Sequence, residues 1–411
     1  MKPKLIVIGG GAAGFFCAVN AARLNPELSV TLLEKTSKLL TKVGVSGGGR
    51  CNVTHACFQI GDMIAKYPRG GQFLRKSFGH FFTTDTIQWF EDRGVKLKTE
   101  ADGRMFPESN KSQTIIECLV REANQYGVEI LMNRDVKAIH DTGNGWTLET
   151  SDKKPLKADF LCIANGGGNK IESFQWLSAL GYAIVPPVPS LFTFNMPHHP
   201  ITKLMGISVE KVKVKIIGTK FIEEGPLLIT HWGFSGPAIL KLSAWAARDL
   251  ANIHYQFKIL VNWCEGDNEQ VVREKMLIAR KEIAGQKITN RNPFQLPQRL
   301  WEFFLQSLGI KEDLRWADLP AKLQNRLITQ LTSQEFVVNG KTTFKEEFVT
   351  SGGIDLKEID PATMQSKLHD RLFFAGEVMD VDGVTGGFNF QHAWTSGFLA
   401  AKQIAEKTRN Q

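Results

Sequence analysis

The residues best suited to chemistry lie near the N-terminus, where a glycine-rich run follows a short apolar segment. Gly9, Gly11 and Gly14 have the spacing G-x-G-x-x-G. Glu34 follows Gly14 by 20 residues. Glycines permit a tight turn and a close approach of backbone amides to a phosphate, which the start of a helix attracts. A carboxylate at that distance accepts hydrogen bonds from ribose hydroxyls and repels a 2′-phosphate. The pattern therefore predicts a site for a dinucleotide without a 2′-phosphate.

A strand, a turn and a helix are needed to position these residues, and the flanking sequence supplies all three. We expect a strand at Lys4–Ile8, a helix at Ala12–Leu24 and a second strand at Ser29–Leu33. This order places the glycine turn at the carboxyl end of the first strand. The binding residues predicted in this unit are Gly9, Gly11, Ala12, Ala13, Gly14, Glu34 and Lys35. The motif alone does not distinguish NAD from FAD.

A second glycine-rich segment near the C-terminus separates these two cofactors. A strand predicted at Arg371–Ala375 leads to Gly376 and Glu377, and the loop Gly383–Gly387 opens a helix from about Asn389 to Lys402. The layout is similar to the second flavin motif of two-segment FAD proteins. There an acidic residue holds the ribityl–phosphate region, and a helix N-terminus stabilises negative charge at the N1/C2=O edge of reduced flavin. An ordinary strand–turn–helix closing a parallel sheet is the alternative. The predicted contacts are Gly376, Glu377, Asp382, Gly386, Gly387, Phe388 and Asn389.

Four further motifs make the resemblance specific. They are VSGGGRCNVTH at Val45–His55, GRMFPES at Gly103–Ser109, THWGFSGPA at Thr230–Ala238 and VTSGGIDLKEIDPATMQSK at Val349–Lys367. With the C-terminal glycine loop they resemble the HI0933-like flavoprotein family, also called BaiN-like or YhiN-like, from Lys4 to about Ala401. One departure is His55, where the family commonly has Asn.

The resemblance implies an α/β fold and a noncovalently bound FAD. It implies a Rossmann-like two-segment FAD-binding domain with an inserted antiparallel β-barrel and a small helical subdomain. Members have been linked to reduction of conjugated enones in steroid-like molecules and to oxidation of small amino ketones. The family therefore does not fix the substrate.

The order of predicted elements agrees with a split flavin domain. We expect this domain at residues 1–190 and 350–411, the barrel at 191–265 and 334–349, and the helical subdomain at 266–333. The prolines of Pro186–Pro189 end regular structure at the first boundary. The strands predicted after it are Leu191–Met196, Ile207–Ile217, Lys220–Ile229, Tyr255–Asn262, Phe336–Val338 and Thr343–Val349. The helices predicted after it are Glu269–Ala284, Pro293–Leu308 and Pro320–Leu331.

Other predicted cofactor contacts come from loops between the two motifs. They are Gly47, Gly48, Gly49, Arg50, Cys51, Val136, Ala164 and Gly166. The three consecutive glycines bring backbone amides toward the flavin or its phosphates, and Arg50 pairs with a phosphate or a substrate anion. A redox role for Cys51 is disfavoured because no second cysteine stands at C-x-x-C spacing. Val136 is where such proteins often hold adenine with backbone groups, and a core valine is the alternative.

Three side chains are candidates for catalysis. Histidine titrates near neutral pH, so His231 and His392 suit proton transfer. Arg104 suits binding of a substrate carboxylate or carbonyl. Each histidine also has a structural alternative, since His392 can fix a backbone carbonyl and His231 can be a satisfied barrel residue. We expect hydride transfer between flavin N5 and a small organic substrate. No second G-x-G-x-x-G unit is present, so NAD(P)H docks transiently over the flavin or another donor replaces it. An NAD-only dehydrogenase is a competing class.

Composition limits the remaining function classes. The net charge of +8 and pI near 9.1 keep open an RNA-modifying flavoprotein. Against this, Lys211, Lys213 and Lys215 alternate with apolar residues, which is typical of the solvated face of a strand. Six cysteines without paired spacing argue against a metal cluster or a disulfide scaffold and favour the reducing cytoplasm. No apolar run reaches the roughly 18 residues of a membrane span.

Overall fold

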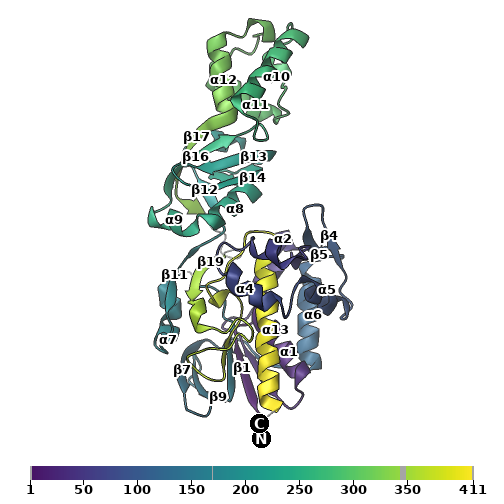
Figure 1. Cartoon of the computed structure of the whole chain (residues 1–411), viewed down its shortest axis with the longest axis vertical. Coiled ribbons are helices and arrows are strands. Elements are labelled where there is room, and N and C mark those ends of the chain that lie inside the picture. The colour runs from purple at the N-terminus through teal and green to yellow at the C-terminus, as the bar shows by residue number, and fades with distance from the viewer. Residues whose placement is uncertain (1, 169, 343–348, 410–411) are drawn as a thin grey trace. The chain divides into compact units, whose positions relative to one another are not determined.

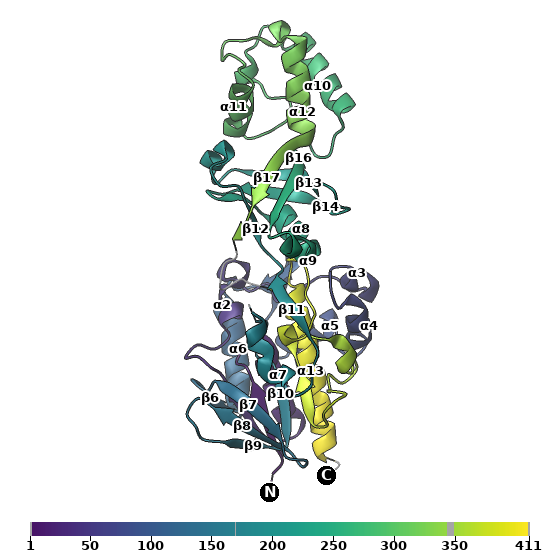
Figure 2. The ribbon, with the colours of Figure 1, turned by 90° about the vertical axis from the view of Figure 1, so that its left-hand side faces the viewer.

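The computed structural model describes residues 2–168, 170–342 and 349–409. The chain divides into two compact units, which are described separately (Figure 1, Figure 2). Unit 1 is Met1–Ser190 with Phe344–Gln411, and unit 2 is Leu191–Thr343. Most of the strand predicted at Thr343–Val349 lies outside the described residues.

Unit 1 is built on a five-stranded parallel sheet in the order β20-β10-β1-β2-β6. The strands are β1 Lys4–Ile8, β2 Ser29–Leu33, β6 Glu129–Leu131, β10 Phe160–Ile163 and β20 Leu372–Phe374. Strands β2 and β6 extend the sheet on one side of β1, and β10 and β20 extend it on the other. The carboxyl ends of β1 and β10 therefore border the switch point, where such sheets bind ligands. This Rossmann-like sheet confirms the predicted fold class.

Helices α1, Ala12–Leu24, and α13, Phe388–Arg409, pack against each other in unit 1 (Figure 1). The packing is close, because a Cβ atom on Gly397 would lie 2.6 Å from the carbonyl oxygen of Ala13. The rings of Phe16 and Trp394 also meet, with centroids 5.2 Å apart. Helix α13 is longer than predicted because its last turns remain buried, and Asn25 Nδ2 donates to Thr408 Oγ1 at 2.9 Å.

Six further helices and three small sheets complete unit 1. The helices are α2 Thr41–Gly49, α3 Ile60–Ile64, α4 Gly71–Phe78, α5 Thr83–Glu91, α6 Ser112–Gln125 and α7 Gln175–Ser178. The strands are β3 Thr54–His55, β4 Leu97–Thr99, β5 Arg104–Pro107, β7 Val136–Asp141, β8 Trp146–Thr150, β9 Leu156–Ala158, β11 Ile184–Pro189 and β19 Thr350–Ile354. The small sheets are β3-β5-β4, β7-β8-β9 and β11-β19.

The proline-rich segment was predicted to end regular structure, but it lies in a strand. Residues Ile184–Pro189 form β11, which pairs with β19 as a two-stranded antiparallel sheet. Prolines are tolerated there because an edge strand need not donate every N–H, and the register shifts between Val185 and Val188. The ladder ends at Pro189 and Thr350, and Ser190 N–H donates to the carbonyl of Val349 at 2.8 Å. The two segments that lead to and from unit 2 are therefore paired.

Unit 2 contains a seven-stranded antiparallel sheet in the order β17-β16-β13-β14-β15-β12-β18. The strands are β12 Thr193–Asn195, β13 Ser208–Ile216, β14 Ile222–Ile229, β15 Gly233–Ser235, β16 Gln256–Asn262, β17 Gln334–Asn339 and β18 Lys341–Thr342. Gly340 separates the two edge strands. Its N–H donates to the carbonyl oxygen of Tyr255 at 2.9 Å, and its own carbonyl oxygen accepts from Asn195 N–H at 3.1 Å. The continuous segment that contains β17 and β18 thus pairs at both edges of the sheet, as in a closed barrel.

The helices of unit 2 pack on this sheet and on one another. They are α8 Pro237–Trp245, α9 Ala247–Asn252, α10 Glu269–Glu282, α11 Gln298–Ser307 and α12 Ala321–Ser333. Trp301, Phe304 and Leu305 of α11 are buried in the core of this unit, and Leu308 packs against it. Lys211 and Lys215 on β13 are exposed and Lys213 is half-buried, while the valines between them are buried. The three lysines therefore lie on the solvated face, as predicted. A separate helical subdomain at 266–333 stays a prediction.

Within the described ranges no helix has the length and apolarity that a membrane crossing requires. All six cysteines carry free thiols.

The glycine turn makes a paired prediction about stability. A Cβ atom on Gly14 would lie 1.9 Å from the carbonyl oxygen of Gly9, whereas one on Gly11 would meet nothing within 4 Å. We expect Gly14→Ala to lower the free energy of unfolding by about 1–3 kcal/mol or more, because α1 must move off β1. Gly11→Ala should stay within about 1 kcal/mol of the wild type. Urea unfolding followed by tryptophan fluorescence measures both, and equal stability of the two variants would contradict the packing.

Candidate cofactor site

The glycine turn leaves the N-terminus of α1 open. Gly9 has a φ of 118°, and a Cβ atom there would lie 2.3 Å from the carbonyl oxygen of Ala164. Gly11 is the N-cap residue of α1, and no side chain caps this helix end. The space at Gly11 is empty to 4 Å. The first N–H groups of the helix are therefore available to an external acceptor, as a bound pyrophosphate requires.

Glu34 lies beside this turn at the end of β2. Its Oε2 accepts from Gly10 N–H at 2.9 Å, and its Oε1 accepts from the N–H and hydroxyl of Thr36, both at 2.8 Å. These bonds fix the carboxylate at the edge of the glycine turn. A carboxylate has about four lone-pair positions, so it can also accept from ribose hydroxyls. The neighbouring Lys35 is exposed.

The three consecutive glycines form a left-handed stretch at the end of α2. Gly47, Gly48 and Gly49 have φ values of 58°, 68° and 82°. Gly48 and Gly49 have nothing within 4 Å of a Cβ position. Glycine adopts such a conformation without steric cost, and the open space lets a ligand approach the backbone. This geometry agrees with the predicted approach of these backbone amides to the flavin or its phosphates, which stays a prediction.

Arg50 and Arg104 lie on either side of one carboxylate. Arg50 Nη1 lies 2.6 Å from Glu100 Oε1, and Arg104 Nη2 lies 3.3 Å from Glu100 Oε2. The guanidinium of Arg50 also stacks 4.0 Å from the ring centroid of Phe106. Arg104 makes a second ion pair with Asp102, at 2.6 Å. Both arginines are therefore held by protein acids, and anion binding by either one stays a prediction.

Cys51 is buried and has no accessible thiolate. Burial raises the pKa of its thiol to about 12, so the thiol is protonated at neutral pH. Because the thiolate is the reactive form, the structure offers no support for redox chemistry at this residue.

Residues 52–55 tie the glycine loop to the start of α13. The Asn52 side-chain oxygen accepts from Gly387 N–H at 2.9 Å, and a Cβ atom on Gly387 would lie 2.5 Å from the Thr54 carbonyl oxygen. His55 Nδ1 lies 2.9 Å from the carbonyl oxygen of Gly386, and its ring stacks on Phe388. The amide of Gly387 is therefore used inside the protein, which differs from its expected role toward the flavin. The N–H groups that lack an intrahelical acceptor in α13 follow it, from Phe388 onward.

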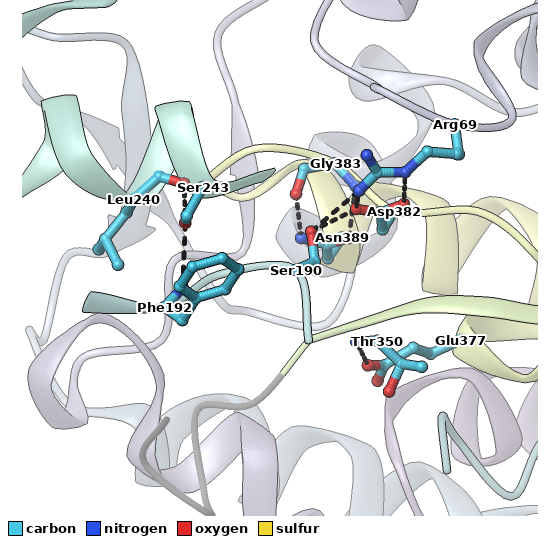
Figure 3. Close-up of polar contacts among 10 residues, drawn as sticks. All are labelled: Arg69, Ser190, Phe192, Leu240, Ser243, Thr350, Glu377, Asp382, Gly383 and Asn389. Atoms are coloured by element: carbon cyan, nitrogen blue, oxygen red, sulfur yellow. Dashed lines mark hydrogen bonds and ion pairs between the residues drawn. The ribbon is translucent and has the colours of Figure 1, made fainter. Parts of the chain in front are cut away.

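Figure 3 shows how the two acids of the C-terminal loop are held. Glu377 Oε1 accepts from Thr350 N–H at 2.7 Å, and its Oε2 pairs with Lys42 Nζ at 2.5 Å. Asp382 is fully buried, and both of its oxygens bind Arg69, one of them also accepting from the hydroxyl of Ser190. Burial raises the pKa of Asp382, and Arg69 opposes that rise.

The surroundings of Asp382 point to a structural role. Its oxygens are occupied, so a direct contact with a cofactor has no support in this structure. Asn389 also acts within the loop, because its amide exchanges two hydrogen bonds with the backbone of Gly383, both at 2.8 Å. Asn52, Lys42 and Arg69 were missed by sequence reasoning. Lys42 lies in the first turn of α2, and Asn52 and Arg69 lie in loops, all far along the chain from the acids and the glycine they contact. The sequence signal for each was only its polar type near glycines.

The other predicted contacts lie around the carboxyl ends of the parallel strands. Ala164 follows β10, and its N–H donates to the carbonyl oxygen of Ile8 at 2.8 Å. Gly166 is left-handed with open space around it, and a Cβ atom on Gly376 would lie 2.7 Å from that of Ala13. Val136 begins β7 and is half-buried. Ala164 and Gly376 thus meet the glycine turn of α1.

The catalytic candidates occupy different environments. His392 is buried in α13, and its Nε2 lies 3.1 Å from the carbonyl oxygen of Gly376. Its Nδ1 is buried without a hydrogen-bond partner among the described residues. Burial lowers the pKa of His392 to about 4, so the ring is neutral at pH 7 and Nε2–H donates to Gly376. His231 is an exposed residue of unit 2 between β14 and β15, whereas His392 and Arg104 belong to unit 1.

The burial of His392 predicts a pH dependence of stability. Its folded-state pKa of about 4 lies below the ordinary value of 6.5. The stability that the neutral ring contributes is therefore complete above the ordinary pKa and is lost as the pH falls toward 4. We expect His392→Gln to lose less unfolding free energy than the wild type between about pH 7 and 5, by about 2 kcal/mol. Urea unfolding at both pH values tests this, and parallel losses in the two proteins would contradict it.

Comparison with known proteins places the chain in a family. It is 30% identical to a ribosomal RNA dihydrouridine synthase of Haemophilus influenzae over 98% of both chains. It is 25% identical to a 3-dehydro-bile acid delta(4,6)-reductase of Clostridium scindens, over 98% of this chain and 99% of that protein. A solved 3-ketosteroid-delta4-(5alpha)-dehydrogenase from Rhodococcus jostii RHA1 shares the fold at 14% identity, with a TM-score of 0.51 over 98% and 97% of the two chains. The family model of the HI0933-like protein Rossmann domain matches residues 3–403, and the chain belongs to this family.

Proposed function

We propose that the chain is an FAD-dependent oxidoreductase. The observation that carries the proposal is the open, uncapped N-terminus of α1 beside Glu34, at the switch point of the parallel sheet. The amides at Gly11 would hold the pyrophosphate, and Glu34 would hold the adenosine ribose. Gly47–Gly49 and the first turn of α13 would face the remainder of the cofactor. Family membership is consistent with this assignment. We also propose a cytoplasmic location, which the free cysteines support.

The bound flavin would supply hydride chemistry at N5, and the protein would bind, orient and tune it. The positive end of α13 is suited to stabilising negative charge on the reduced isoalloxazine. Glu377 and Asp382 do not cancel this effect, because Lys42 and Arg69 neutralise them. His392 is neutral and fixes the carbonyl of Gly376, so we do not assign it proton transfer at pH 7.

We propose that the reaction is reduction of a carbon–carbon double bond conjugated to a carbonyl group. The names of two relatives support this class. A dihydrouridine synthase forms a uracil ring with its 5,6 bond reduced, and a delta(4,6)-reductase acts on double bonds of a bile acid that carries a 3-keto group. Both bonds are activated for hydride addition by a conjugated carbonyl. A small enone is the first candidate substrate, and NADH or NADPH docking transiently is the proposed donor.

Uridine in RNA is the second candidate substrate. It is favoured by the relative at 30% identity and by the distribution of charge. Residues 191–343 hold 20 of the 50 Lys and Arg but only 14 of the 42 Asp and Glu. Unit 2 therefore carries a net charge of +6 out of the +8 of the whole chain. A positive excess of this kind attracts the phosphate backbone of nucleic acid.

Glu34→Gln tests the cofactor assignment. The substitution keeps the size of the side chain and removes its charge, so we expect FAD affinity to fall by about tenfold to a hundredfold. Glu27→Gln is the matched control, because Glu27 is exposed and pairs only distantly with Lys2, at 3.7 Å. FAD released by denaturation and the dissociation constant of each variant are the measurements. Release of FMN, or unchanged affinity in Glu34→Gln, would contradict the proposal.

Anaerobic turnover tests the reaction and its substrate. The holoenzyme is reduced with NADH or NADPH, then mixed with a steroid-like enone, an amino ketone or uridine-containing ribosomal RNA. We expect flavin reoxidation with formation of the saturated product from an enone or from RNA, and no reoxidation by the amino ketone. Reoxidation by RNA that weakens steeply with salt identifies the second candidate. Reduction of the oxidised flavin by the amino ketone, with no reaction at either double bond, would overturn the proposed class.

A further inference from the structure

A cavity of about 510 Å³ lies in unit 1, away from the glycine motifs. Its lining residues come from the last turn of α1, from α5 and the turn that follows it, and from the end of α6 with the residue after it. Its size falls in the usual range of small-ligand sites, about 300–1,000 Å³. We call it the arginine pocket, and its lining residues are Arg23, Trp89, Asp92, Arg93, Arg121, Glu122, Gln125 and Tyr126.

One arginine of the pocket, Arg93, is paired within the protein. Arg93 Nε pairs with Glu122 Oε2 at 2.6 Å, and both side chains are largely buried. Its Nη1 donates to the carbonyl of Trp89 at 2.8 Å, and its guanidinium lies 3.8 Å from the Trp89 ring centroid. Arg93 and Glu122 therefore form an ion pair whose opposite charges largely offset each other.

The other two arginines retain unused donors. Arg23 Nε is buried and has no hydrogen-bond partner among the described residues, and its Nη2 makes one long bond, 3.4 Å, to Asn20 Oδ1. Arg121 Nη2 donates to the carbonyl of Arg93 at 2.8 Å, and its side chain is exposed. In the part of the chain that the structure describes, neither Arg23 nor Arg121 forms an ion pair with a carboxylate. A buried guanidinium N–H without an acceptor is costly unless a ligand supplies one.

The electrostatics favour an anion in this position. Burial and the nearby charge of Arg93 lower the pKa of Arg23, and the charges of Tyr126, Glu122 and Asp92 oppose this shift. Three arginines and two acids line the pocket, so its charge balance is positive. A negative group bound between Arg23 and Arg121, which both line the pocket, would offset the cost of burying Arg23. The planar fork of arginine matches the oxygens of a phosphate, which accepts from several donors at once.

The arginine pocket is separate from the cofactor site. Gly11 and Arg23 stand at opposite ends of α1, and 12 residues of helix place them about 18 Å apart along its axis. A phosphate bound at Arg23 is therefore not the pyrophosphate proposed at Gly11.

We propose that the arginine pocket is a second anion site, which binds a phosphate group through Arg23 and Arg121. The phosphate belongs either to a small metabolite or to a nucleic-acid backbone, and both present the same oxygens. The proposal does not depend on the proposed oxidoreductase activity.

Calorimetric titration of the FAD-loaded protein tests the site. Using the holoenzyme keeps the α1 N-terminus filled, and chloride keeps the ionic strength constant. We expect inorganic phosphate to bind saturably to the wild type, and Arg23→Gln and Arg121→Gln each to weaken that binding by about tenfold. Arg75→Gln is the matched control, since Arg75 is exposed on α4 and its Nε donates to Gln72 on the same helix. It should bind phosphate as the wild type does.

Uridine 5′-monophosphate and a uridine-containing RNA oligonucleotide distinguish the two sources of phosphate. Binding of the monophosphate that competes with inorganic phosphate and depends on Arg23 assigns the pocket to a small ligand. Tighter competitive binding of the RNA, with the same dependence, assigns it to a nucleic-acid backbone. Absence of saturable phosphate binding, or equal binding by the wild type and both variants, overturns the proposal. Arg121→Gln keeps the test decisive if Arg23→Gln folds poorly, because Arg121 is exposed.

Discussion

Contact between backbone atoms at the carboxyl ends of β1 and β10 is the constraint on which unit 1 depends. Gly9 lies against Ala164, and Gly14 lies against the carbonyl of Gly9, with no room for a Cβ atom at either glycine. This contact holds α1 on the sheet with its N-terminus at the switch point. Helix α13 then packs on α1 through Gly397, which carries the C-terminal loop to the same edge. The N-terminal glycine turn and the C-terminal loop therefore meet because Gly9, Gly14 and Gly397 lack side chains.

The elements that the sequence predicted well are those defined by neighbouring residues. The bounds of β1, α1 and β2 agree with the prediction because apolar periodicity and the glycine turn are local signals. Strands β9 and β10 lie in different sheets, although only Asp159 separates them along the chain. The chain changes sheet at Asp159, whose carboxylate accepts from Lys4 N–H at 2.7 Å. That partner lies 155 residues away, so no local pattern reveals the break.

The candidate site shows the same division. The glycines of both motifs were predicted because their backbone requirements are visible in the sequence. Asp382 looks like a ligand from its place in a glycine loop, yet Arg69 and Ser190 occupy it. Such pairing depends on three loops that meet only in the folded chain. Sequence reasoning also left the arginine pocket undetected, since Arg23, Arg93 and Arg121 belong to three separate helices or turns.

The pairing of β11 with β19 has a consequence for how the chain tolerates its long insertion. Because Pro189 is opposite Thr350, the ends of the insertion are fixed side by side by unit 1 itself. The entropy of closing even a flexible loop grows slowly, by about 0.6 kcal/mol for each doubling of its length. Here the two ends leave from one rung of the ladder, Pro189 opposite Thr350, so unit 1 itself already brings them together. The free-energy cost of connecting the 153 residues of unit 2 to unit 1 is therefore close to that of a hairpin turn. Their sequence can diverge without destabilising unit 1.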